Sequence, residues 1–476
     1  MAHAQQELPS ASEAPRKSLR RVLRALAWTL AGLVALAGFA LVAVMVTGQL
    51  RSAAALDRLR ASGAPLYPED LRFAPSPNSA SFDAWVQRGR EVDEQLDESE
   101  GLAPSECAEF VAALPTPLYT DLELREDFQF AIEDPHRAGR LTDCHRAVHR
   151  VWMVESASTL AWALSLESSA RPDWRTTLGS SSDLRVPLTQ VPVRQTNIAA
   201  EALLIAMLNE AWSGNSAEAV QLCARMFELA SIYHDAPDMV TFGMIGYQES
   251  MAASALQALV LALPPGVDLQ VIEAQFDATS ASERFRFALE GQRASDNASY
   301  RDIADGVSRF PVETRMEQLD ALAVRIAGGW LQSMDLEQYE QQFALLGRRY
   351  VDAKPVLERL AEEDTTSTRR FFHGMTALDD LRSLAHLETV RVLSKALLVA
   401  YRDGVEAARV WARTQPDPFG AGMLRARVDD DGVLTIWSVG ANGRDDGAPL
   451  PPWAIEDWGP DRPPDPAIRF RPREVR

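Results

Sequence analysis

A run of 26 uncharged, mostly apolar residues at positions 25–50 constrains the fold of this chain more than any other feature. An α-helix rises 1.5 Å per residue, so about 20 such residues cross the hydrocarbon core of a bilayer. Five basic side chains lie before the run, within residues 1–24, and three follow it closely. Because basic residues favour the cytoplasmic side, we predict a cytoplasmic tail at 1–24, a transmembrane anchor at 25–50 and an extracytoplasmic remainder.

A cleaved signal peptide is the alternative interpretation of the same run. Small residues at 52–55 could serve as a cleavage site. The apolar region of a signal peptide is usually about 7–15 residues long, which is shorter than this run. The length therefore favours an uncleaved anchor. Only three of the 48 basic residues are lysine, and alanine is abundant. This composition is typical of a GC-rich bacterial genome. The location that we expect for the anchored chain is the bacterial inner membrane, which the chain crosses once.

The net charge of −19 is distributed unevenly over the 476 residues. Residues 1–50 carry five basic and two acidic side chains, which leaves a charge of −22 on residues 51–476. A surface this acidic repels phosphate backbones, so nucleic acid is excluded as a partner. The length is too great for one ordinary core and indicates two to three domains or an extended body.

Three cysteines bear on the compartment: Cys107, Cys144 and Cys223. Cys223 lies on an apolar helical stripe with Ala219, Leu222, Met226 and Leu229, and we expect it to be a buried free thiol. Outside the cytoplasm a remaining pair of cysteines tends to oxidise. Cys107 and Cys144 are therefore the candidate disulfide.

Helical periodicity dominates residues 81–415, which follow a predicted linker at 51–80. We expect a mainly α fold, an irregular helical bundle or solenoid of antiparallel helical pairs, joined to the single N-terminal transmembrane helix. The segment 172–190 interrupts the pattern with glycine, serine and proline and is predicted as a loop. The predicted helices cover 82–96, 141–166, 195–212, 216–233, 239–262, 267–278, 281–305, 312–333, 335–362 and 369–413.

Two of these helical segments carry further signals. The pair 195–232, with Ala211-Trp212-Ser213-Gly214-Asn215 at its turn, resembles a single tetratricopeptide-type unit, but no second copy follows at a 34-residue period. The last long helix carries an apolar stripe, which we predict to be core. Its members are Leu378, Leu381, Leu384, Leu387, Val390, Leu393 and Leu397.

Catalytic motifs are sparse in the helical segment. His145 and His149 have the i, i+4 spacing of zinc peptidases, but Arg146 stands where those enzymes need glutamate. The triplet 295–297 matches the Ser-Asp-Asn element of penicillin-recognising enzymes, but no Ser-x-x-Lys accompanies it, and helix N-capping is the simpler explanation. An envelope hydrolase with a site around His145 and His149 therefore stays an alternative, and we assign no catalytic residue.

Composition changes after Thr414, where ten of the 28 prolines are concentrated. Residues 423–428 and 433–439 alternate as strands around an Asp-Asp-Asp-Gly turn, which predicts a β-hairpin in a module at 416–447. The acidic, glycine-rich run 440–447 supplies the oxygen ligands that calcium prefers. The tail at 448–476 is predicted to be extended, with Trp453, Trp458, Ile468 and Phe470 buried.

Three motifs stand in this ending: Pro416-Asp417-Pro418-Phe419-Gly420, then Trp437-Ser438-Val439-Gly440-Ala441-Asn442-Gly443, and Asp445-Asp446-Gly447. With these motifs the ending resembles the C-terminal end of the major pseudopilins of type II secretion. The resemblance implies a Ca²⁺ loop with Ser438, Asn442, Asp445 and Asp446 as candidate ligands. The apolar segment lacks the glutamate of pseudopilins, which argues against processing and incorporation into a pilus.

Two further motifs lie within the chain, LRASGAPLYPEDL at 59–71 and ALEGQRA at 288–294. Together with the C-terminal end, they resemble the sequences of uncharacterised, membrane-anchored bacterial exported proteins with helical bodies. This likeness implies no activity. The function we expect is a non-enzymatic scaffold or interaction protein of the bacterial envelope, whose protein partner the sequence does not identify; a component associated with a secretion apparatus is a further alternative.

Overall fold

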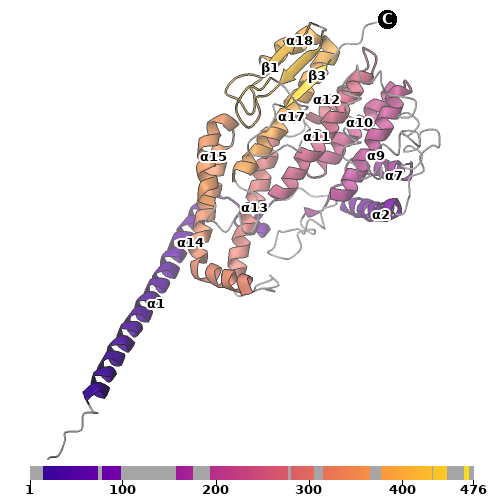
Figure 1. Ribbon diagram of the computed structural model, residues 1–476. Coiled ribbons are helices and arrows are strands. Elements are labelled where there is room, and N and C mark those ends of the chain that lie inside the picture. Colours follow the sequence, from indigo (N-terminus) through magenta and orange to yellow (C-terminus); the bar gives the residue numbers. More distant parts are fainter. Residues whose placement is uncertain are drawn as a thin grey trace, which may run out of the picture. The chain divides into compact units, whose positions relative to one another are not determined.

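The computed structural model describes residues 14–72, 78–97, 157–174, 193–276, 280–304, 315–364, 377–430, 432–447 and 466–470 (Figure 1). Cys107, Cys144, His145, His149, Trp453 and Trp458 lie outside these residues. The disulfide and the histidine pair therefore stay predictions. The chain divides into two compact units. We call Met1–Gly63 with Tyr300–Glu337 the anchor unit, and Ala64–Ser299 with Gln338–Arg476 the body unit.

The anchor unit contains the longest helix, α1 (Ala14–Ser62). Side chains from Leu26 to Val44 are exposed on every face, and the apolar part of α1 is long enough to cross a bilayer. A signal sequence would meet the same criterion. The helix continues past residue 50 to Ser62, so the first residues of the predicted linker are helical.

The body unit is mainly helical, as predicted. Its helices, two of which (α13 and α14) extend into the anchor unit, are α2 (Ser79–Asp97), α7 (Ala157–Leu164), α9 (Val193–Trp212), α10 (Ser216–Ser231), α11 (Met239–Ala262), α12 (Gln270–Glu273), α13 (Ala281–Ala304), α14 (Arg315–Leu345), α15 (Tyr350–Asp364), α17 (Ala377–Asp403) and α18 (Val405–Ala412). Short 3₁₀ turns at Pro68–Asp70 and Ala274–Phe276 complete the set described. The predicted bounds of α9, α10, α11 and α13 agree with these within two residues.

Two predicted helix boundaries were wrong. The break expected near residue 334 lies after Leu345, where Gly347 has φ of 83°. The helix expected to run from 369 to 413 is divided at Gly404, where φ is 93°. Both breaks use a glycine because a backbone with positive φ disfavours any side chain.

The core is built around α11, whose side chains are buried on nearly all faces. Helix α10 packs against α9 and α11, and α17 packs against α11. The apolar stripe of α17 is buried from Leu381 to Leu397, which confirms the core prediction for its described side chains. Cys223 is a free, fully buried thiol, also as predicted.

A three-stranded antiparallel sheet follows α18. Its order is β1 (Arg425–Val428), β2 (Leu434–Trp437) and β3 (Ala467–Phe470). The β1–β2 hairpin is confirmed, with Ala426 opposite Ile436. The sequence predicted no third strand, but the tail supplies one, and it places Ile468 opposite Ile436. Ile468 and Phe470 are buried, as predicted for the tail.

Candidate functional site

The segment that follows the anchor helix is built into the body unit. We call residues 64–71 the post-anchor segment. Arg293 donates through Nη2 to the carbonyl of Pro65 at 3.1 Å, and Asn297 donates through Nδ2 to the carbonyl of Leu66 at 2.9 Å. Both donors are nearly fully buried side chains of α13. The two motifs at 59–71 and 288–294 therefore meet in space, through Arg293 and Pro65.

Local hydrogen bonds shape the post-anchor segment. The Asp70 carboxylate accepts from the backbone N–H groups of Leu66 and Tyr67, both at 3.0 Å. This closes a 3₁₀ turn that begins at Pro68, whose fixed φ suits the first position of such a turn. Leu66 and Leu71 are buried on either side of the turn. The segment is thus a folded part of the body and not an extended connection.

The triplet 295–297 has a structural role, but not the one predicted. It lies in the interior of α13, so the N-capping explanation was wrong. Asp296 accepts hydrogen bonds from Tyr339 Oη at 2.5 Å and from Gln292 Nε2 at 3.1 Å. A similar bond in the anchor unit joins Tyr300 to Asp335. These aspartates join α13 to α14, because each accepts from a tyrosine of the other helix.

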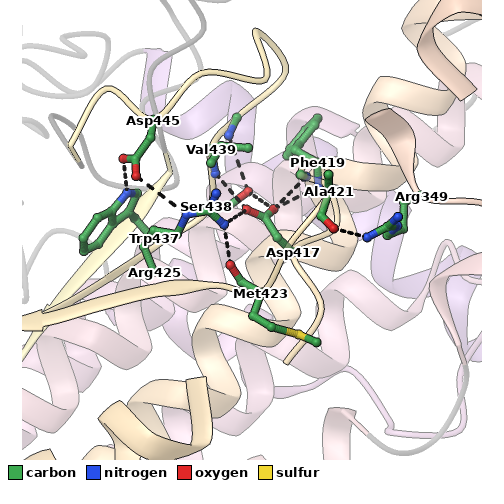
Figure 2. Close-up of polar contacts among 12 residues, drawn as sticks. Arg349, Asp417, Phe419, Ala421, Met423, Arg425, Trp437, Ser438, Val439 and Asp445 are labelled. Atoms are coloured by element: carbon green, nitrogen blue, oxygen red, sulfur yellow. Dashed lines mark hydrogen bonds and ion pairs between the residues drawn. The ribbon is translucent and has the colours of Figure 1, made fainter. Parts of the chain in front are cut away.

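Asp417 is the centre of the C-terminal module (Figure 2). Its side chain is fully buried, and its carboxylate accepts from the backbone N–H groups of Phe419, Gly420 and Val439 at 3.0–3.1 Å. Ser438 Oγ donates to the same carboxylate at 2.6 Å. One side chain thus joins the turn after α18 to the end of β2. These hydrogen bonds explain why the Asp-Pro-aromatic-Gly motif contains an aspartate.

The candidate calcium ligands lie in three different environments. Ser438 is buried and directed at Asp417. Asn442 donates to Asp446 at 2.6 Å, and both are exposed or partly exposed in the loop. Asp445 accepts from Trp437 Nε1 at 2.9 Å. Within the described residues no group of three or more His, Cys, Asp or Glu side chains could hold a metal ion, and the calcium hypothesis stays a prediction.

Arg425 connects these environments. Its Nη1 lies 3.5 Å from the Asp417 carboxylate and its Nε lies 3.6 Å from that of Asp445 (Figure 2). The guanidinium therefore stands between the buried aspartate and the acidic loop. A cation in the loop would have to share Asp445 with Arg425 and Trp437, or displace them.

A second cluster of charged side chains lies inside the helical core. Glu249 of α11 forms ion pairs with Arg284 of α13 at 2.7 Å and with Arg391 of α17 at 2.7 Å. His234, in the turn after α10, places Nε2 at 3.5 Å from the same carboxylate. All four side chains are buried or nearly so. We call these residues the Glu249 cluster.

The environment of the cluster strongly lowers the pKa values of Glu249 and His234. Burial raises the pKa of Glu249, but the contact with His234 and the charges of Arg391 and Arg284 outweigh burial and bring the pKa down to about 2. Burial lowers the pKa of His234 to about 4, despite the neighbouring carboxylate. The cluster therefore holds a carboxylate, two guanidinium groups and a neutral imidazole at neutral pH.

A buried serine–histidine pair lies beside the cluster. Ser250 Oγ is 3.1 Å from Nε2 of His386, and burial lowers the pKa of this histidine to about 4. The serine hydroxyl donates to the carbonyl of Gly246 at 2.7 Å. Because this hydrogen bond uses the only proton of the hydroxyl, the arrangement differs from that of a serine nucleophile that donates to its histidine base.

The comparisons with known proteins add no assignment. No family model matches the chain, no curated protein matches it, and no solved structure matches it. The likenesses to pseudopilins and to membrane-anchored exported proteins therefore rest on the motifs alone.

Sequence reasoning found the C-terminal module but missed the Glu249 cluster. Its members are separated by up to 157 residues and lie in three helices and one turn, without a shared motif. One signal was available: Glu249 is the single charged residue in the sequence of α11, which is otherwise made of apolar, small or uncharged residues. Charged residues on an apolar face predict a buried partner, although they do not identify it.

Proposed function

We propose that this protein is a membrane-anchored, extracytoplasmic scaffold or interaction protein of the bacterial envelope. The observation that supports the proposal is the continuity between anchor and body. The part of α1 that is exposed on all faces, Leu26–Val44, continues as helix to Ser62, and the post-anchor segment that follows is held by the buried donors Arg293 and Asn297. A protein built in this way is tethered at the membrane by part of its own fold.

The proposal includes the location and the finer architecture. The excess of basic residues before residue 25 supports a cytoplasmic N-terminus in the inner membrane, with the acidic body outside the cytoplasm. Neighbouring helices such as α9 and α10, joined by a tight turn, support a bundle or solenoid of antiparallel pairs. Solenoids of this kind commonly present extended binding surfaces.

Chemical crosslinking in cells, followed by purification and mass spectrometry, tests the proposal. The sheet packs on α17 and α18, so removal of the C-terminal module would also expose their apolar surface. Surface substitutions are the sharper probe. Met423→Asp with Val428→Asp changes two exposed apolar side chains of the module, and Leu164→Asp changes one on α7 as a matched control.

We expect the full-length protein to capture a specific protein partner. Loss of that partner in the Met423/Val428 variant, with retention in the Leu164 variant, assigns docking to the C-terminal module. If no variant and no parent protein captures a partner above the level of an unrelated membrane protein, the scaffold proposal is contradicted. The hydrolase alternative, which depends on His145 and His149, would then have to be tested by an activity screen.

A further inference from the structure

Two independent features of the anchor unit place the end of the membrane span at the same point. A count of about 20 residues from Ala25, the first residue after Arg24, reaches Val44. The burial pattern changes just beyond it. Side chains from Leu26 to Val44 are exposed on all faces, and Gly48 is the first buried residue from Leu26 onward. Ser52, Ala55 and Leu59 continue the buried stripe at helical spacing.

Trp330 of α14 lies against α1 at this point. Its indole N–H is 3.1 Å from the carbonyl of Val44 and 3.2 Å from Thr47 Oγ1. The backbones approach closely here, because a Cβ at Gly48 would lie 2.5 Å from the indole of Trp330. Figure 1 shows α14 beside the C-terminal part of α1.

A positive charge completes the arrangement. Arg51 places its guanidinium carbon 4.4 Å from the centre of the Trp330 ring. The same side chain is 3.4 Å from Glu337, and nearly half of it is exposed. Tryptophan is enriched at the boundary between hydrocarbon and headgroups, where its ring is apolar and its N–H is polar. Arginine near a membrane surface attracts anionic headgroup phosphates.

We propose that Trp330 and Arg51 form an interfacial collar that binds the lipid headgroup layer and sets the depth of α1. The inference rests on the proposed membrane anchoring. A contact that fixes the depth of α1 is needed because the apolar run is about six residues, or about 9 Å of helix, longer than the span that crosses the hydrocarbon core. Without a fixed contact the helix could slide by that amount and still keep apolar residues in the hydrocarbon core.

Depth measurement by spin-label EPR tests the collar. Full-length protein, with its three native cysteines replaced by alanine, is labelled at Val42→Cys or Leu50→Cys and reconstituted into vesicles of phosphatidylethanolamine and phosphatidylglycerol. Both positions are exposed on α1. Oxygen and a water-soluble nickel chelate then report the depth of each label. We expect the label at 42 in the hydrocarbon core and the label at 50 among the headgroups.

The decisive comparison uses Trp330→Ala. We expect the label at 50 to move inward by about one helical turn, roughly 5 Å. Trp212→Ala removes a partly exposed tryptophan of α9 and should leave the depth unchanged. Arg51→Gln keeps the indole and should shift the label less, with the shift confined to vesicles that contain phosphatidylglycerol.

Two results would contradict the collar, and a third would contradict the membrane anchoring. A label at 50 that is fully in water in the parent protein, or one whose depth is the same in Trp330→Ala, overturns the collar. Circular dichroism of the variant shows whether the helical content has been kept, and a variant that has lost it is replaced by Trp330→Phe, which keeps an aromatic ring but removes the indole N–H and reduces the size of the side chain. Failure of the parent protein to enter vesicles at all contradicts the anchoring itself.

Discussion

At the scale of single residues, the buried charge at Glu249 is the most demanding feature of the body. One carboxylate compensates two guanidinium groups from different helices, Arg284 and Arg391. Burial of charge costs free energy unless every member is paired, so the cluster ties α11, α13 and α17 together at one point.

Glu249→Gln should therefore destabilise the body strongly. The change removes the carboxylate that both buried guanidinium groups contact, and we expect a loss of about 3 kcal/mol in the free energy of unfolding. Urea denaturation followed by tryptophan fluorescence measures it. Glu406→Gln is the matched control, since Glu406 pairs with Arg409 on the surface and its loss should have no measurable effect. Equal behaviour of the two variants would contradict the structural role of the cluster.

The buried histidines His234 and His386, together with Glu249, predict that the stability of the protein depends on pH. The pKa values of His234 and His386 are lowered to about 4, below the unfolded value of about 6.5. Between these values the unfolded chain binds more protons than the native protein, so stability falls as pH decreases from about 6.5 to 4. The lowered pKa of Glu249 adds a further loss as pH falls from about 4.5 toward 2.

Thermal unfolding across this range checks the prediction. His386→Gln should reduce the decrease in melting temperature between pH 6.5 and 4. The variant should retain the further decrease below pH 4.5 that is expected from Glu249. A profile identical to that of the parent protein would show that His386 is not titrating as its burial requires.

At the scale of elements, the helices were largely predictable from sequence and their ends were less so. The apolar spacing of 239–262 and 281–305 predicted α11 and α13, because each helix has to cover a continuous core. The breaks at Gly347 and Gly404 were missed because helical periodicity continues across them. Strand β3 was missed because four residues in a proline-rich tail carry little signal until β2 supplies a partner.

Asp417 joins the turn after α18 to the end of β2 through its hydrogen bonds to Phe419 and Val439. Asp417→Asn replaces an acceptor of four hydrogen bonds by a group that can also direct an NH₂ at those donors. We expect a loss of about 2 kcal/mol or more. Hydrogen exchange should show faster exchange at the amides of Ile436 and Ile468. Asp429→Asn, in the exposed hairpin turn, is the control and should leave exchange at both amides unchanged.

The calcium hypothesis is also decided at this scale. It predicts heat on titration of the full-length protein with Ca²⁺, and a melting temperature that falls on addition of a chelator. Asp445→Asn should weaken both effects, because Asp445 belongs to the predicted ligand set. Absence of heat together with chelator-insensitive melting would reject calcium and leave the loop as a hydrogen-bonded turn around Trp437 and Asn442.

For the molecule as a whole, the order of the anchor, the helical segment and the C-terminal module could be predicted from the sequence. The packing of the segment that follows the anchor could not. The apolar run, the helical segment and the C-terminal sheet follow from composition and periodicity. The post-anchor segment was predicted as linker because proline and serine resemble loop composition. Its docking depends on Arg293 and Asn297, more than 220 residues away along the chain, which no local pattern reports.

We propose that the chain is held in the membrane by its own uncleaved N-terminal helix. Intact mass spectrometry of the protein extracted from alkaline-washed membranes tests this proposal. We predict that the protein remains in the membrane pellet and that its mass includes residues 1–50. A soluble species whose mass begins near residues 52–55 would show that the helix is a signal peptide and would contradict the account.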